Sequence, residues 1–169
     1  VAAGNRILEL LNETPTITDD ELPYELPEDG DGSLKFSKVN FKYGNEKIFD
    51  DLTLEIEGKK TVAIVGSTGS GKSTLAYLLP RLYEIESVSI EIDGVDIKNL
   101  RLSDLRSNVS LAFEESFLFS NTARENISLG LEDASQEEIE DAALIARAHD
   151  FISQLPESYE TKVGERGYG

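Results

Sequence analysis

The fold of this chain is decided by one stretch of sequence, Gly66-Ser67-Thr68-Gly69-Ser70-Gly71-Lys72-Ser73, which Thr74 follows. The stretch matches the phosphate-binding loop pattern G-x-x-x-x-G-K-[ST] at every fixed position. Glycines let the backbone wrap closely around two phosphates, because no side chain intrudes and a positive φ is allowed. The stretch therefore predicts a nest of backbone N–H groups that binds the phosphates of a nucleotide.

The end of the same stretch supplies the charged and metal-binding groups of such a site. Lys72 places an ammonium group near the β- and γ-phosphates, and Ser73 offers a hydroxyl ligand to Mg²⁺, which prefers oxygen. The helix that begins here points its N-terminal N–H groups at the same anion. We therefore expect ATP and Mg²⁺ as cofactors. The predicted ligands within the loop are Gly66, Ser67, Thr68, Gly69, Ser70, Gly71, Lys72, Ser73 and Thr74.

The flanking sequence gives the context that this motif requires. Residues 61–65 (Thr-Val-Ala-Ile-Val) form a short apolar run, which predicts a buried parallel strand that ends at the loop. Leucines at helical spacing predict a helix over residues 73–81. The alternative is a glycine-rich turn without a ligand, and the strand–loop–helix order argues against it.

Composition excludes several classes of protein. A formal net charge of −17 and a pI near 4.3 argue against a nucleic-acid-binding surface, so no nucleic-acid partner is expected. No apolar run reaches the roughly 20 residues of a membrane-spanning helix, and no secretory signal is recognisable. The absence of cysteine is consistent with a reducing compartment. The acidity itself is typical of a solvated surface.

Two segments precede the first predicted strand. Residues 1–12 predict a short helix with Ile7, Leu8 and Leu11 on one stripe. Residues 13–33 are rich in acidic residues, proline and glycine, which predicts a solvated linker. Because the helix lacks an N-cap of its own, we expect the linker to connect a preceding domain, with an ordinary N-terminal tail as the alternative.

Alternating apolar residues predict strands from Leu34 onward. Residues 34–43 and 48–56 predict an antiparallel pair joined by a turn at Gly44-Asn45, and residues 88–94 predict a further half-buried strand. A short helix is predicted over residues 97–106, with Ser103 as its cap.

A second buried strand is predicted over residues 108–113, and Glu114 follows it. Ligands of open α/β sheets bind beyond the carboxyl ends of the strands, so Glu114 is expected near the metal. Further along, Ser135 and Glu138 form the sequence pattern of a capping box, and another short helix is predicted over residues 150–155. His149, the single histidine, is interpreted as a helix-boundary residue rather than a catalyst.

Together these motifs resemble the nucleotide-binding domain of ABC transporters of the exporter type, over essentially the whole chain. Besides the phosphate loop, four segments carry the resemblance. Residues 39–43 resemble the adenine-stacking loop, in which Tyr43 would be the aromatic residue that stacks on the base. Residues 117–122 and 125–127 are similar to the segment after the Q-loop. Residues 161–167 resemble the X-loop, and residues 1–11 the end of the last transmembrane helix.

The resemblance implies an α/β fold of the P-loop NTPase class. It combines a small antiparallel β subdomain, a RecA-like parallel sheet and the start of a helical subdomain. Residues 1–12 would end a transmembrane or coupling helix, and residues 13–33 would be an acidic linker. Residues 34–169 would be the N-terminal part of the ATP-binding domain. Within it lie the β subdomain and P-loop core (34–114), the helical subdomain (115–160) and the X-loop (161–167).

The sequence departs from the family pattern at three places. Glu114 stands where the family has the Q-loop glutamine, and Val88 stands where glycine is frequent. A carboxylate at 114 attracts Mg²⁺ more strongly but repels the γ-phosphate, so Ser73 and Glu114 are the predicted metal ligands of a specialised site. The third departure is that the signature motif, the Walker B strand with the catalytic glutamate and the switch histidine would all follow Gly169.

Because of that third departure, we expect no catalytic residue within this chain and little activity from it alone. The same missing strands would leave a core surface exposed. The parent protein is predicted to be a transport-coupled ABC-type ATPase at the cytoplasmic face of the cell membrane. Its expected partners are a membrane domain, contacted through residues 161–167 and the region of Glu114, and a second ATP-binding domain in a homo- or heterodimer.

Two alternatives to a transport ATPase stay open at this point. A soluble ABC ATPase that acts on DNA or ribosomes is disfavoured by the X-loop and by the acidic charge. A nonhydrolysing subunit of a heterodimeric exporter is favoured slightly by Glu114.

Overall fold

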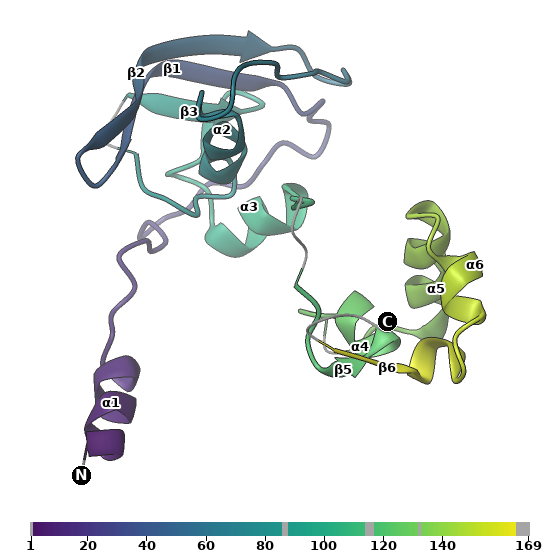
Figure 1. Cartoon of the computed structure of the whole chain (residues 1–169). Coiled ribbons are helices and arrows are strands. Elements are labelled where there is room, and N and C mark those ends of the chain that lie inside the picture. The colour runs from purple at the N-terminus through teal and green to yellow at the C-terminus, as the bar shows by residue number, and fades with distance from the viewer. Residues whose placement is uncertain (1, 86–87, 114–116, 132, 165–169) are drawn as a thin grey trace. The chain divides into compact units, whose positions relative to one another are not determined.

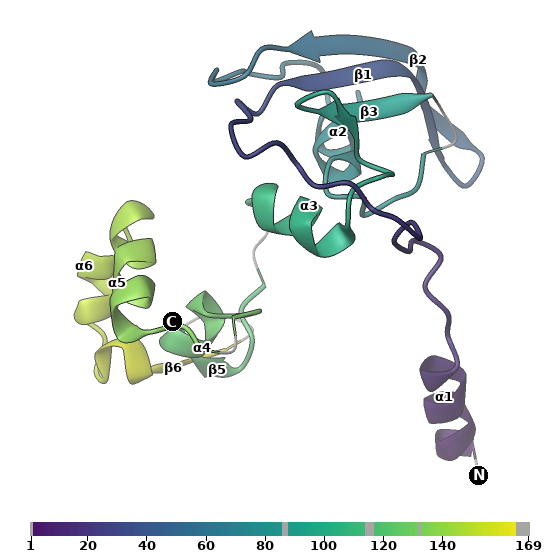
Figure 2. The ribbon, with the colours of Figure 1, turned by 180° about the vertical axis from the view of Figure 1, so that it is seen from behind.

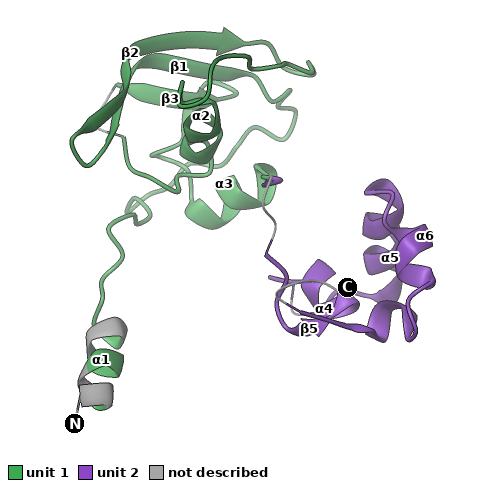
Figure 3. Cartoon of the chain, in the orientation of Figure 1, with its two compact units in different colours: residues 1–111 green, residues 112–169 purple. Residues whose placement is uncertain are grey.

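The computed structural model describes residues 2–85, 88–113, 117–131 and 133–164. The chain divides into two units, residues 1–111 and residues 112–169 (Figure 3). Each unit has its own cluster of buried apolar side chains. The predicted phosphate loop belongs to the first unit, and the capping box at Ser135 belongs to the second.

The first unit begins with helix α1 (Ala2–Leu11), as predicted. Its apolar stripe is exposed, with 60% of Ile7, 57% of Leu8 and 73% of Leu11 accessible to solvent. No helix in the described ranges combines the length and apolar character that crossing a membrane requires. The stripe is therefore an uncovered apolar face of a short helix.

The segment between α1 and the sheet contacts the rest of its unit at defined points. The N–H of Tyr24 donates to the carbonyl of Asn99 at 2.7 Å. The Asp93 carboxylate accepts the N–H groups of Gly32 and Ser33, both at 2.9 Å. Burial raises the pKa of Asp93, but hydrogen bonds from Ser33 and Asp31 outweigh it and leave the pKa below its usual value. These contacts hold the end of the acidic segment against the sheet.

A four-stranded antiparallel sheet forms the body of this unit (Figure 1). Its order is β2 (Glu46–Ile56), β1 (Leu34–Tyr43), β3 (Ser89–Ile92) and β4 (Val95–Asp96). β1 and β2 form the predicted hairpin, in which Tyr43 pairs with Glu46 and Gly44 takes a φ of 57° in the turn. The antiparallel subdomain is therefore confirmed.

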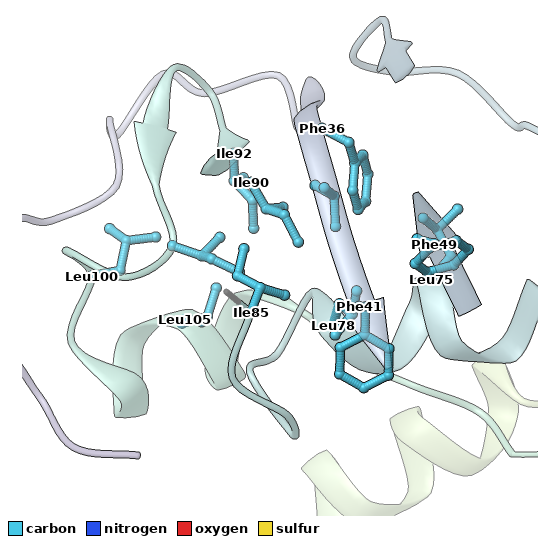
Figure 4. Packing of buried hydrophobic residues seen from close by; sticks show 12 residues of the cluster. Phe36, Phe41, Phe49, Leu75, Leu78, Ile85, Ile90, Ile92, Leu100 and Leu105 are labelled. Atoms are coloured by element: carbon cyan, nitrogen blue, oxygen red, sulfur yellow. The ribbon is translucent and has the colours of Figure 1, made fainter. Parts of the chain in front are cut away.

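Helix α2 (Lys72–Leu78) packs against one face of this sheet and ends shortly before Pro80. Figure 4 shows Leu75 and Leu78 among the apolar side chains of the strands. Burying one such leucine contributes about 1.5–3 kcal/mol. This packing fixes the helix that begins at the phosphate loop. The cluster comprises Phe36, Val39, Phe41, Phe49, Leu75, Leu78, Ile85, Ile90, Ile92, Ile97, Leu100 and Leu105.

Helix α3 (Leu102–Asn108) starts differently from the prediction. Ser103 is not its cap, because Arg101 holds that position and makes no side-chain capping bond. The Asp19 carboxylate accepts the N–H of Leu102 at 2.6 Å instead, from 83 residues earlier in the chain. A distant acceptor thus replaces the local one, which shifts the helix start.

The prediction of parallel strands over residues 61–65 and 108–113 is wrong. Residues 61–65 form no strand, and 52% of Val62 and 87% of Val65 are exposed. Asn108 ends α3, and half of Phe113 is exposed. A strand in a parallel sheet needs hydrogen-bonded neighbours, and the described residues place none beside these runs. No parallel pairing therefore forms at these runs within the described residues, and their apolar side chains are exposed.

The second unit is mainly helical and contains α4 (Ala123–Ile127), α5 (Gln136–Ile145) and α6 (His149–Ser153) (Figure 2). A 3₁₀ helix, η1 (Ser158–Glu160), follows, and the two-residue strands β5 (Asn121–Thr122) and β6 (Lys162–Val163) pair antiparallel. Its cluster consists of Ala123, Ile139, Ala143, Ile152 and Tyr159.

Capping boxes begin two helices of this unit. The predicted box at α5 is confirmed, since Ser135 N–H lies 2.8 Å from Glu138 Oε2 and Glu138 N–H lies 3.2 Å from Ser135 Oγ. Hydrogen bonds from Ser135 lower the pKa of the Glu138 carboxyl. An equivalent box at α4, formed by Thr122 and Glu125, was not predicted. His149 begins α6, as expected of a boundary residue, and its Nδ1 lies 2.9 Å from the Tyr159 hydroxyl.

Candidate nucleotide-binding site

The phosphate loop turns on glycines in the left-handed region. Gly69 has a φ of 82° and Gly71 a φ of 88°, which L side chains rarely adopt. Between them, the N–H of Ser70 donates to the carbonyl of Ser67 at 3.2 Å. The loop thus has the alternating backbone that presents N–H groups to an anion.

Strand β2 packs directly against the end of this loop. A Cβ atom built on Gly71 would lie 2.7 Å from Cε1 of Phe49 and 2.9 Å from Cγ2 of Ile48. A Cβ atom on Gly69 would meet nothing within 4 Å. Glycine at 71 is therefore required by backbone conformation and by packing, whereas at 69 conformation alone requires it.

The Lys72 ammonium is held over the loop by two carbonyl oxygens. Its Nζ donates to the carbonyl of Gly66 at 3.0 Å and to that of Ser67 at 2.8 Å. Neutral carbonyls are weaker acceptors for an ammonium than phosphate oxygens are. The lysine is thus placed beside the loop where an anion would meet it, and the residues fit a phosphate group.

The first turn of α2 separates an exposed hydroxyl from a buried one. Ser73 is exposed, so its hydroxyl is accessible to a metal ion. Thr74 is only 7% exposed, and the hydroxyl of Tyr43 donates to its Oγ1 at 3.4 Å. The structure therefore brings the end of β1 next to the phosphate loop, and 37% of Tyr43 stays exposed to solvent.

Three neighbours of these residues were not among the predicted site residues. Phe49 packs against Gly71, and Phe41 and Tyr83 both contact the ring of Tyr43. Phe41 carried a signal as part of the segment 39–43 that resembles the adenine-stacking loop. Tyr83 carried no signal, because its contact depends on the path of the chain after α2.

Other predicted site residues lie outside the described residues. Glu114 is among them, and so are residues 165–167 of the predicted X-loop. Of that loop, Lys162 and Val163 form β6, and the carbonyl of Thr161 accepts the N–H of Ala123 at 3.0 Å. Within the described ranges, no three His, Cys, Asp or Glu side chains gather to hold a metal ion.

A cavity of about 380 Å³ lies in the second unit and has a different character. Its lining is almost entirely apolar and includes Leu118, Ala142, Phe151 and Val163. Such a lining offers no compensation for the charge of a triphosphate. The cavity is therefore not the nucleotide site.

Comparisons with known proteins point to one family. A family model described as ABC transporter matches residues 49–167. The chain is 45% identical over 167 residues to ABC transporter B family member 18 of Arabidopsis thaliana. This alignment covers 97% of the chain and 14% of that protein. It is 47% identical over 138 residues to the putative multidrug export ATP-binding/permease protein YgaD of Bacillus subtilis (strain 168), covering 80% of this chain and 24% of that protein.

A solved structure agrees with these relatives. The structure of a bacterial Atm1-family ABC exporter with ATP bound matches 97% of this chain and 29% of its own, with a TM-score of 0.85 and 36% identity. The chain thus spans a small part of each of these proteins. The predicted resemblance to exporters is confirmed by both kinds of comparison. The phosphate loop, the antiparallel subdomain and these matches together show that the chain belongs to the ABC transporter family.

Proposed function

We propose that this chain is the ATP-binding part of an ABC exporter, in which ATP binding and hydrolysis drive transport of a substrate across a membrane. One observation carries the proposal. Lys72 Nζ lies on the carbonyls of Gly66 and Ser67, within a loop whose glycines at 69 and 71 are left-handed. This arrangement supplies an ammonium group and backbone N–H donors to a triphosphate.

The metal would be held mainly by the nucleotide and by Ser73. Mg²⁺ takes few protein ligands when phosphate oxygens complete its shell. This fits the described residues, in which Ser73 is exposed and no acidic cluster surrounds the loop. Glu114 would add a second ligand, and its negative charge would repel the γ-phosphate at the same time.

The adenine base would stack on Tyr43, the last residue of β1. Tyr43 shares a hydrogen bond with Thr74 of the loop helix, and its ring is partly exposed. The ring thus lies next to the phosphate loop and remains accessible to a ligand. Stacking on it would distinguish a nucleotide from a bare phosphate.

We expect Tyr43→Ala to weaken ATP binding by about 1 kcal/mol, because one aromatic stacking contact is lost. Pyrophosphate has no base, so its affinity should change little. Titration calorimetry on the complete protein, with a nonhydrolysable ATP analogue and with pyrophosphate, compares the two ligands. Tyr24→Ala, at a 63% exposed tyrosine outside the loop, is a suitable control. Equal losses for both ligands would show that Tyr43 does not contact adenine.

Glu114→Gln tests the proposed second metal ligand. Removing the carboxylate should relieve its repulsion of the γ-phosphate and weaken its attraction for Mg²⁺. Metal-free ATP is therefore expected to bind more tightly, and the gain in affinity on adding Mg²⁺ should shrink. ATP titrations with EDTA and with Mg²⁺, together with ATP turnover, measure both effects. If none of these quantities changes, residue 114 lies away from the metal.

The membrane partner would contact the second unit. Phe117 and Phe119 are 59% and 49% exposed, and their ring centroids lie 5.1 Å apart. Asn126 fixes this segment, since its Oδ1 accepts the N–H of Phe119 at 2.8 Å. An exposed aromatic pair just before β5, which pairs with Lys162 and Val163 of the predicted X-loop, suits a protein interface. We propose that a membrane domain covers it at the cytoplasmic face, and that a second ATP-binding domain completes a homo- or heterodimer.

A nonhydrolysing subunit is the second candidate function, and the residue at 114 favours it. ATPase assays on the complete protein separate the candidates, with and without a paired subunit. Turnover that depends on this subunit's own nucleotide site supports the transport ATPase. Tight ATP binding without turnover at this site supports the nonhydrolysing role.

A further inference from the structure

Two aromatic rings contact the ring proposed to stack on adenine, and the three rings form a cluster. The centroid of Tyr43 lies 4.9 Å from that of Phe41, with an interplanar angle of 88°, and 5.2 Å from that of Tyr83, with an angle of 80°. Phe41 and Tyr83 also contact each other, at 5.7 Å. All three pairs have the edge-to-face geometry that aromatic rings prefer.

The members of this cluster differ in burial. Phe41 is 8% exposed and belongs to the core, whereas Tyr83 is 42% exposed. Phe41 comes from the same strand as Tyr43, two residues earlier. Tyr83 comes from the segment that follows α2, so it supports Tyr43 from outside the sheet.

The segment that carries Tyr83 is fixed by two arginines. Arg81 is 6% exposed, donates to the Lys98 carbonyl at 3.3 Å and pairs with Glu84 at 3.1 Å. The guanidinium of Arg106 donates to the carbonyls of Pro80 at 3.1 Å and Arg81 at 3.2 Å. Tyr83 therefore stands on a fixed stretch of backbone rather than on a loosely held loop.

Contacts with Tyr43 come from both ends of α2. Thr74 in the first turn accepts the Tyr43 hydroxyl, and Tyr83 beyond the last turn contacts its ring. A ring held at its hydroxyl and along its side loses rotamer freedom before a ligand arrives. Preorganisation of this kind lowers the entropic cost of binding.

We propose that Tyr83 is a positioning residue, which holds Tyr43 in the orientation that receives the adenine base. This inference rests on the proposed function of Tyr43. Tyr83 acts through Tyr43 and contacts neither the base nor the phosphates. The aromatic ring of Tyr83 carries the effect, because the ring makes the edge-to-face contacts.

The test measures affinities of the complete protein for a nonhydrolysable ATP analogue and for pyrophosphate. Tyr83→Ala is expected to lower the affinity for the analogue about fivefold, as for the loss of one edge-to-face pair. The affinity for pyrophosphate should not change. Tyr83→Phe should restore the affinity. Leu82→Ala is the matched control, since Leu82 lies on the same segment and is 43% exposed; it should bind both ligands normally.

A double variant separates positioning from direct contact. In the Tyr43→Ala background, Tyr83→Ala should cause no further loss, because its effect passes through Tyr43. An added loss there would overturn the proposal, since Tyr83 would then contact the base itself. The proposal would also be overturned if Tyr83→Ala lost as much affinity for pyrophosphate as for the analogue. It would equally be overturned if Tyr83→Ala bound the analogue normally while Tyr43→Ala bound it weakly. Both results would leave the adenine role of Tyr43 intact. If Tyr43→Ala binds the analogue normally, the proposed function of Tyr43 fails instead.

Discussion

Lys72→Ala is expected to abolish detectable ATP binding. The change removes the ammonium group that lies on the Gly66 and Ser67 carbonyls, and with it the charge that faces the β- and γ-phosphates. The ammonium group would donate hydrogen bonds to the β- and γ-phosphates. Hydrogen bonds to charged groups are each worth about 1.5–3 kcal/mol, so losing two such bonds to phosphate weakens binding by at least about a hundredfold. Titration of the complete protein with ATP and with pyrophosphate measures the loss, which should be similar for both ligands.

Two further variants make this result specific. Lys72→Met keeps most of the side-chain length without the charge, and it should bind as poorly as the alanine variant. Lys60→Ala changes a lysine whose side chain is 60% exposed and pairs only loosely with Glu57, at 3.8 Å, so it should bind normally. Unchanged affinity in both Lys72 variants would refute the assignment of the site to this loop.

Gly71→Ala should be nearly as damaging, although it removes no ligand atom. The new Cβ would sit 2.7 Å from Phe49 Cε1 on a residue whose φ is 88°. Strain at such a φ costs about 1–3 kcal/mol, and overpacking adds about 1–3 kcal/mol. If the whole cost falls on the binding conformation, ATP affinity drops by at least about thirtyfold. The affinities of the variant for ATP and for pyrophosphate measure this drop.

Gly69→Ala is the matched control for this prediction. Gly69 has a similar φ of 82°, but its Cβ would meet nothing within 4 Å, so only the conformational cost remains. Its loss of affinity should therefore be clearly smaller. Phe49→Leu in the Gly71→Ala background removes the nearest clashing atoms and should recover part of the binding. Equal losses at 69 and 71, without recovery, would show that β2 does not shape the loop.

Much of the first unit was predictable from sequence because its signals are local. The spacing of Gly66, Gly71 and Lys72 defines the loop, and alternation with Gly44 at the turn defines the hairpin. The Ser135 capping box is local in the same way, since both partners lie within one turn. The hairpin and the Ser135 capping box, whose partners lie a few residues apart, were therefore confirmed.

The failures share a dependence on distant parts of the chain. Residues 61–65 have the composition of a strand, but a strand exists only beside another strand. The start of α3 was misplaced because its acceptor is Asp19 rather than Ser103. The contact of Tyr83 with Tyr43 likewise follows from how the segment after α2 folds back. No local pattern encodes these pairings.

The bond between Asp19 and the first N–H of α3 limits how far α1 can travel. Eight residue steps lead from Leu11, the end of α1, to Asp19, and at about 3.4 Å per step they extend to about 27 Å. Within that radius, α1 can move without disturbing the sheet or the loop. Any larger displacement must break the hydrogen bond to the Asp19 carboxylate and leave the first N–H of α3 without this acceptor.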